Sequence, residues 1–374
     1  MSSDFIFDRG PTEYFHGRKE IIDTFNSALE IFQKKKGGTI FLIQGAPGVG
    51  KTALLDVLSM QAKKRGWKTT HIYPHALWNA NELLRYLRKR SKRQISGLSI
   101  EGDIDNAGPA NLSAEIKAPV WTIIKLLQKQ KKPLLLILDE AQSLGLKGNV
   151  PDDMKSVVIS ILKQIHNGDL RRPVMLLAGG LGTTESALKT LGISRYVTGC
   201  TVKLGRLDKE SESAVIRDWL TLAGGAVDDP TIWIDSIAEH THGWPQHIIS
   251  YIKPAIKCLK SNNYRLTDEG LEFVLESGNE FRLQYYDQRA HDIDEDHRLA
   301  LAKAVMDVPI DDTMTRPAVL SSLLQSGLNQ KEADDLFTRA LEQGMIDQRK
   351  GGRYGIPIPY FHNWLIDEYA KRKC

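Results

Sequence analysis

The chain has 374 residues, enough for two to three domains of ordinary size. Hydrophobic residues make up 41% and charged residues 26%, which is ordinary for a globular protein, and a net charge of +4 is too small to indicate a nucleic-acid partner by itself. No apolar run is long enough to span a membrane, residues 1–4 do not resemble a signal peptide, and the three cysteines form no CxxC pair. These features exclude a disulfide framework and a zinc site, and we expect a cytoplasmic protein without a membrane partner.

The first predicted element is a buried strand over residues 39–44, where the run is β-branched and apolar. It leads into a segment that satisfies GxxxxGK[ST], and residues 53–58 continue with helical spacing. Glycines let backbone N–H groups surround phosphates, and the helix N-terminus adds its positive end. The expected ATP-binding residues are Gly45, Ala46, Pro47, Gly48, Val49, Gly50, Lys51 and Thr52.

Within this motif Lys51 is expected to reach the β- and γ-phosphates, and the Thr52 hydroxyl to bind Mg²⁺. The alternative is a chance match in a glycine-containing turn. A strand before the loop and a helix after it are the context that the phosphate-binding motif needs, so they favour the functional interpretation.

After a second predicted strand at 68–72 comes a dense group of basic residues, which we call the basic cluster: Arg85, Arg88, Lys89, Arg90, Lys92 and Arg93. The segment at 95–116 is turn-rich and partly alternating, which predicts a β-hairpin inserted into the core over about 85–118. Clustered Lys and Arg could contact the phosphates of DNA. The alternative is a solvated helix face followed by a connector.

A further buried strand is predicted over 133–138, and it ends in Asp139 and Glu140. A carboxylate at the tip of a parallel strand is where the Walker B element belongs. Asp139 would hold Mg²⁺, and Glu140 would orient and deprotonate the attacking water. An acidic strand terminator is the alternative, but the preceding glycine loop favours the catalytic interpretation.

With these motifs in order, the chain resembles AAA+ ATPases of the branch that contains initiator-type, origin-recognition-like proteins. The resemblance covers about residues 12–260. Residues 15–20 resemble the element that opens such modules and borders the adenine pocket, which implies a nucleotide-binding role for Arg18. Residues 173–180 resemble the sensor-1 strand, and 202–207 with 208–219 resemble the last core strand and the first lid helix.

Residues 191–196 resemble the helix end that carries an arginine finger, which implies that Arg195 is catalytic in a neighbouring protomer and that the chain forms a homo-oligomer. On spacing alone, Arg195 could equally be a solvated surface residue. The chain departs from the family twice. The sensor-1 strand ends in two glycines, with Thr183 as the nearest hydroxyl. The sensor-2 segment lacks its arginine, so Gln246 or His247 takes that place near the γ-phosphate.

The C-terminal part shows helical patterns at 294–308, 317–325 and 330–343, then a hairpin with a turn at 350–352. This order resembles a winged helix, which docks either DNA or protein. Its third helix is net negative and is disfavoured for the DNA groove. The hairpin is the better candidate for DNA, because it carries Arg349, Lys350 and Arg353.

The sequence therefore predicts an α/β protein with an AAA+ P-loop core on a parallel sheet over 1–205, a small helical lid over 206–290, and a winged-helix-like domain over 291–374. The expected function is an oligomeric Mg-ATP-hydrolysing switch that acts on DNA or on a DNA-bound partner. The alternative is a signalling switch that docks a protein partner through the C-terminal domain, without DNA. A weaker third alternative is a stand-alone chaperone.

Overall fold

The computed structural model describes residues 15–34, 38–73, 84, 122–123, 125–127, 129, 131–145, 163, 172–190, 200–223, 229–263, 265–306 and 313–370. They divide into two compact units. The sheet unit contains the described residues within 19–44 and 54–203, and the helical unit contains those within 1–18, 45–53 and 204–374.

The sheet unit is built on five parallel strands in the order β2-β3-β4-β1-β5. The strands are β1 (Ile40–Gln44), β2 (Lys68–Ile72), β3 (Leu134–Leu138), β4 (Val174–Gly180) and β5 (Thr201–Lys203). Every residue of β1, β3 and β4 is buried, as expected of inner strands covered on both faces. The strands predicted over 39–44, 68–72 and 133–138 are thereby confirmed, as is the strand at 173–180.

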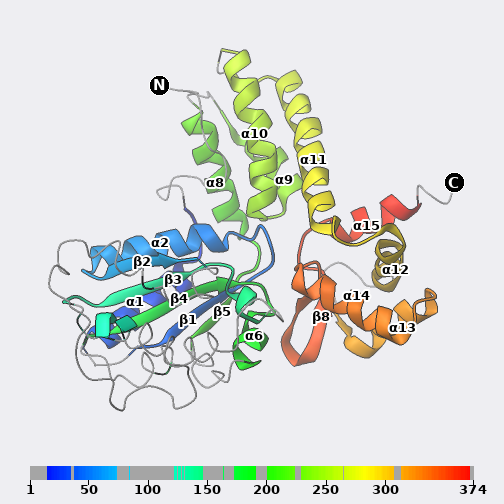
Figure 1. The fold of residues 1–374 in the computed structure, drawn as a ribbon. Helices are drawn as coiled ribbons and strands as arrows, with labels where there is room; N and C mark the ends of the chain where they lie inside the picture. Colours follow the sequence, from blue (N-terminus) through cyan, green and yellow to red (C-terminus); the bar gives the residue numbers. More distant parts are fainter. Residues whose placement is uncertain are drawn as a thin grey trace. The chain divides into compact units, whose positions relative to one another are not determined.

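Helices flank this sheet, and α2 (Lys51–Lys64) runs along one face of it (Figure 1). On α1 (Lys19–Lys34), Phe25 packs edge-to-face on Phe41 of β1, with ring centroids 5.3 Å apart. The register pairs Gln44 with Gly180 and Leu138 with Ala178. The carboxyl ends of β1, β3 and β4 therefore lie at one edge, where ligands bind in open parallel sheets.

Four helices make up the first part of the helical unit: α8 (Lys209–Leu222), α9 (Thr231–Thr241), α10 (Pro245–Ser261) and α11 (Asp268–Ala290). Asp208 caps α8 by accepting from the backbone N–H of Ser211 at 2.8 Å, and Thr267 caps α11 through Gly270. The helices enclose a core in which Trp219, Trp233 and Tyr251 are buried. A helix was predicted over 208–219, and α8 confirms it.

The C-terminal part contains α12 (Glu295–Met306), α13 (Arg316–Gln325), α14 (Gln330–Glu342) and α15 (Phe361–Ala370). Its strands β6 (Met314–Thr315), β8 (Arg353–Gly355) and β7 (Asp347–Gln348) form a small antiparallel sheet in that order. The three helices and the hairpin predicted here are present (Figure 1). Their assignment to a winged helix stays a prediction.

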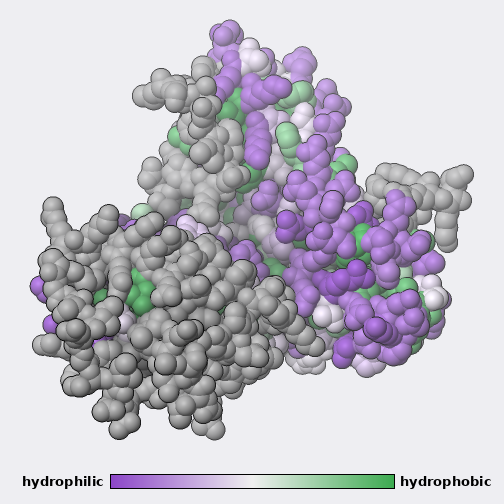
Figure 2. Space-filling model, viewed as in Figure 1, coloured by the Kyte–Doolittle hydropathy of each residue, from purple (hydrophilic) through white to green (hydrophobic). Residues whose placement is uncertain are grey.

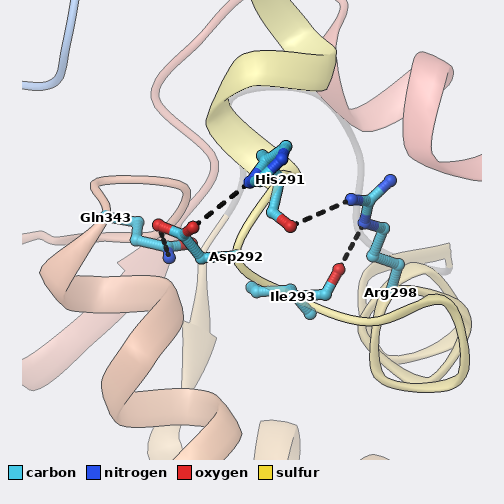
Figure 3. A network of polar contacts seen from close by, with 5 residues as sticks. All are labelled: His291, Asp292, Ile293, Arg298 and Gln343. Carbon is cyan, nitrogen blue, oxygen red and sulfur yellow. Dashed lines mark hydrogen bonds and ion pairs between the residues drawn. The ribbon is translucent and has the colours of Figure 1, made fainter.

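A short network of polar contacts fixes the link between α11 and α12 (Figure 3). Arg298 donates to the carbonyl of Ile293 at 2.6 Å and to that of His291 at 3.5 Å. Gln343, at the end of α14, donates to Asp292 at 3.3 Å. Because Gln343 follows α14, these contacts tie the link to the C-terminal helices.

A second connection joins α11 to α15 through aromatic rings. The Tyr286 hydroxyl donates to the carbonyl of Pro359 at 2.7 Å, and its ring packs on Phe361 and Trp364. Figure 2 shows that the visible face of the C-terminal part is largely hydrophilic. Within the described ranges, none of the helices combines the length and apolarity that a bilayer crossing requires.

Candidate nucleotide-binding site

The loop between β1 and α2 has the backbone that the glycine-rich pattern predicts. β1 ends at Gln44 and α2 begins at Lys51. Gly48 and Gly50 have φ angles of +77° and +92°, a region that L side chains adopt only with strain. A glycine loop that opens directly into a helix N-terminus is suited to bind an anion, because backbone N–H groups there have no helical partner.

Lys51 lies inside this loop. Its side chain is almost fully buried, and its ammonium group donates to the carbonyls of Gly45 at 2.9 Å and Ala46 at 3.0 Å. Hydrogen bonds from a charged donor are among the stronger ones in proteins. The loop therefore holds a cation beside its own backbone at the start of a helix, which suits an anion such as a phosphate group.

The start of α10 touches the same loop. The backbone N–H of Gln246 donates to the carbonyl of Gly48 at 3.0 Å. A Cβ atom at Gly48 would lie 2.6 Å from the Cβ of Gln246 and 2.9 Å from the Tyr285 hydroxyl. Gln246 is thus beside the glycine loop, and its contact with a γ-phosphate stays a prediction. Gly48 has to be glycine for this approach as well as for its backbone angle.

His247 was the alternative to Gln246, and the structure places it elsewhere. Its side chain is completely buried among the rings of Trp244, Tyr285 and Tyr286. Burial, together with the positive charge of Arg282, lowers the pKa of His247 to about 3, so its imidazole is neutral. The expectation that His247 could face the γ-phosphate is wrong, because α10 turns this side chain into an aromatic core.

Tyr285 is a loop contact that sequence reasoning missed. Its hydroxyl donates to the carbonyl of Pro47 at 2.9 Å, across a separation of 238 residues. Burial raises the pKa of Tyr285 to about 12, which keeps the phenol protonated and able to donate. No local pattern on α11 marks this residue, since two adjacent tyrosines on a helix have many uses.

Arg18 directly precedes α1 in the sequence. It has a φ of 61°, and its guanidinium donates to the carbonyls of Arg206, at 3.2 Å, and Gly205. The preceding Gly17 also has a positive φ, and a Cβ there would come 2.7 Å from the Ser211 hydroxyl. The structure thus brings Arg18 together with 205–206, and its contact with a nucleotide stays a prediction.

Asp139 and Glu140 directly follow β3. The Asp139 carboxylate accepts from the backbone N–H of Glu140 at 2.9 Å. Glu140 has a φ of 55°, an uncommon angle for a residue with a side chain, and its carboxylate accepts from the Gln142 amide. Strained backbone of this kind is often found at functional sites. Gln142, on η3 (Ala141–Gly145), was not among the predicted site residues.

The hydroxyl group beside the end of β4 comes from a different threonine than expected. Among the described residues, the hydroxyl beside Gly180 belongs to Thr184 of α6 (Thr184–Thr190), and not to Thr183 as the sequence suggested. The Thr184 hydroxyl donates to the carbonyl of Leu181 at 2.6 Å, so it helps to start α6.

Two other predictions fall outside the described residues. They are Arg195 and the inserted segment at about 85–118, which includes the basic cluster. Both stay predictions.

A family model described as an AAA ATPase domain matches residues 14–177. Sequence comparison with curated proteins gives no match. Among solved structures, the chain is similar to the ORC2 protein of Aeropyrum pernix in its ADP form, with a TM-score of 0.58 and 14% identity over 100% of this chain and 97% of that one.

The ADPNP–ADP complexes of the same archaeal protein match with a TM-score of 0.56 and 15% identity, over 96% of this chain and 95% of that one. Cdc6p of Pyrobaculum aerophilum matches with a TM-score of 0.51 and 14% identity, again over 96% and 95%. Residues 14–177 therefore resemble an AAA ATPase domain, and the chain as a whole has the fold of the archaeal ORC2 and Cdc6p structures.

Proposed function

We propose that this protein binds Mg-ATP at its glycine loop and hydrolyses it, as an oligomeric switch that acts on DNA or on a DNA-bound partner. The observation that carries the proposal is the buried Lys51 ammonium held within the loop of Gly45–Gly50 at the start of α2. The ADPNP–ADP complexes of the similar ORC2 protein support a nucleotide as the ligand.

The residues present fit both the phosphates and the magnesium ion of Mg-ATP. The Lys51 ammonium would exchange its carbonyl acceptors for the β- and γ-phosphate oxygens. The Thr52 hydroxyl and the Asp139 carboxylate are oxygen donors, which Mg²⁺ prefers. When bound, Mg²⁺ would neutralise charge on the phosphate oxygens. Asp139 is already oriented by the N–H of Glu140.

Glu140 is the proposed general base. It would accept a proton from water as the water oxygen attacks the γ-phosphorus and the bond to the β-phosphate bridging oxygen breaks, which releases ADP and phosphate. The exposed Glu140 carboxylate, held at the end of β3, supports this role. Gln246 would donate to the γ-phosphate from the lid, in the place where a guanidinium is usual.

Arg195 of a neighbouring protomer would complete the site, because an uncharged Gln246 stabilises the developing charge less than an arginine would. The expected active form is therefore a homo-oligomer, in which turnover per protomer rises with protein concentration.

DNA is the proposed partner through the basic cluster, since clustered Lys and Arg neutralise backbone phosphates. In the hairpin of the C-terminal domain, Arg349 is exposed, whereas Arg353 donates to the Thr313 side chain at 2.5 Å. Arg349 is thus the better placed of the two for a phosphate contact.

A protein partner is the second candidate, and α14 favours it. Its exposed positions include Glu332, Asp335 and Glu342, which would repel a phosphate backbone. Asp334 is bound by Arg316 at 2.7 Å, so that carboxylate is already compensated. This face suits a basic protein surface better than a DNA groove.

The test is ATP turnover and ATP binding measured on the wild-type chain and on Glu140→Gln, at several protein concentrations. Glu140→Gln should bind ATP as the wild type does and hydrolyse it at least about 100-fold more slowly, because the isosteric amide cannot accept the proton. Unchanged turnover in Glu140→Gln would contradict the proposal and place the base elsewhere.

A further inference from the structure

The two glycines at the end of β4 adjoin side chains of α2, of α6 and of the segment that follows β3. A Cβ atom at Gly179 would lie 3.1 Å from an Asp139 carboxylate oxygen. A Cβ atom at Gly180 would lie 2.8 Å from the Gln142 side-chain oxygen and 2.2 Å from the Thr184 hydroxyl. Two glycines therefore end this strand because side chains of other segments occupy the adjoining space.

Gln142 uses that space to make two hydrogen bonds with opposite roles. Its amide NH₂ donates to the Glu140 carboxylate, and its amide oxygen accepts from the backbone N–H of Leu181 at 3.2 Å. A carboxylate only accepts and an N–H only donates, so these partners determine which way the amide faces. Gln142 thus connects Glu140 to the first residue after β4.

The backbone around Glu140 is held from both sides as well. Its N–H donates to Asp139, and its carbonyl accepts from the N–H of Ser143 at 3.0 Å. These contacts and the left-handed backbone angle at Glu140 direct the chain into η3. Gln142, two residues after Glu140, lies in this short helix. The side-chain bond from Gln142 then restrains the carboxylate itself.

We propose that Gln142 is the positioning residue for Glu140, and that it replaces the polar side chain which the glycine-ended β4 strand lacks. The inference rests on the proposed function, in which Glu140 is the base. A base must present one carboxylate oxygen to water in a constant direction, and misplacement by about 1 Å can slow a reaction about 100-fold. The Gln142 amide holds Oε2 and leaves Oε1 to accept from water.

A purely structural role for Gln142 would be to satisfy the Leu181 N–H, and the two roles can be separated. Gln142→Glu has the same shape and keeps an acceptor for Leu181, but it replaces the donor to Glu140 with a repelling carboxylate. Gln142→Met has similar length and removes both bonds. Comparing the two distinguishes the effect on Glu140 from the effect on Leu181.

The experiment measures kcat, the Kd of a non-hydrolysable ATP analogue, and Tm, for the wild type and both Gln142 variants. Gln142→Glu should lower kcat by about 10- to 100-fold and leave the analogue Kd within about twofold. In a Glu140→Gln background the same substitution should have no further effect on kcat, because the positioned group is already gone. If Gln142→Glu does not fold, Gln142→Met is compared with and without Glu140→Gln: a loss of kcat that depends on Glu140 reports positioning, and a loss of Tm reports the missing Leu181 bond.

Two results would overturn the inference: a wild-type kcat in a folded Gln142 variant, or an equal loss of rate with and without Glu140. If Glu140→Gln is inactive while Gln142→Glu turns over normally, only the positioning role fails. If Glu140→Gln turns over normally, the proposed base fails and the positioning role fails with it.

Discussion

At the scale of one residue, Gly48 brings the glycine loop into contact with the start of α10. Its φ of +77° requires glycine, and its missing side chain allows Gln246 to approach the loop. Lys51 depends on the same loop, because it bonds to loop carbonyls. A change at Gly48 should therefore affect ligand binding without touching any charged group.

Gly48→Ala is expected to raise the Kd for ATP at least about tenfold, since a Cβ atom 2.6 Å from the Gln246 Cβ must displace either the loop or the start of α10. Gly66→Ala is the matched control. Gly66 also has a positive φ, of +80°, but a Cβ there would meet no atom within 4 Å. It should carry the same backbone strain and leave the Kd unchanged.

Titration calorimetry with an ATP analogue measures both variants. Equal Kd values for Gly48→Ala and the wild type would show that close packing of the loop against α10 is not needed for ATP binding. An equal loss in Gly66→Ala would assign the effect to backbone strain alone.

At the scale of elements, α10 carries a buried histidine that makes the helical unit sensitive to acid. The folded pKa of His247 is about 3, against an ordinary value of 6.5. Below pH 6.5 the unfolded chain therefore binds a proton that the folded chain does not. Stability should fall as the pH drops from 7 toward 3, and the contribution at pH 5 is about 2 kcal/mol.

His247→Phe should remove this part of the pH dependence, because an aromatic ring without a proton site suits the cage of Trp244, Tyr285 and Tyr286. Urea unfolding at pH 7 and pH 5 measures it. The wild type should lose about 2 kcal/mol more than the variant between these pH values. His291→Asn, at an 84% exposed position, should behave as the wild type. If the wild type and His247→Phe lose the same free energy of unfolding between pH 7 and pH 5, His247 is not the source of the pH dependence.

The elements were largely predictable from the sequence, for a physical reason. Inner parallel strands are short, continuous apolar runs, so β1 and β3 are visible without tertiary information. The glycine loop is equally local. By contrast, the Tyr285 bond to Pro47 spans 238 residues and depends on helix packing. Gln142 became recognisable only when the register of β3 and β4 placed it beside Gly180.

At the scale of the whole molecule, the fold is that of archaeal ORC and Cdc6 proteins, at 14–15% identity. Similarity at this level concerns architecture. The proposal of a DNA partner therefore depends on charge, and the chain carries charges of both signs. The basic cluster favours DNA, and the exposed acids of α14 favour a protein.

Replacing Arg88, Lys89 and Arg90 with Ser should weaken ATP-dependent DNA binding on unrelated sequences alike, because phosphate contacts do not read bases. Each lost contact should reduce the log–log salt slope by about 0.9 on duplex DNA. A salt titration of DNA affinity measures this. Asp335→Ser, on the exposed face of α14, should leave the slope unchanged. Equal slopes in the triple variant and wild type would favour the protein-docking function.

The central claim is that the Lys51 loop binds ATP, and the most direct measurement is the Kd of Mg-ATP for wild type, Lys51→Ala and Lys63→Ala. Lys51 is buried in the loop, whereas Lys63 is an exposed lysine of the same helix. Lys51→Ala should weaken binding at least about 100-fold through loss of a buried charge-assisted contact, and Lys63→Ala should bind as the wild type does. Equal affinities of Lys51→Ala and wild type would contradict the account.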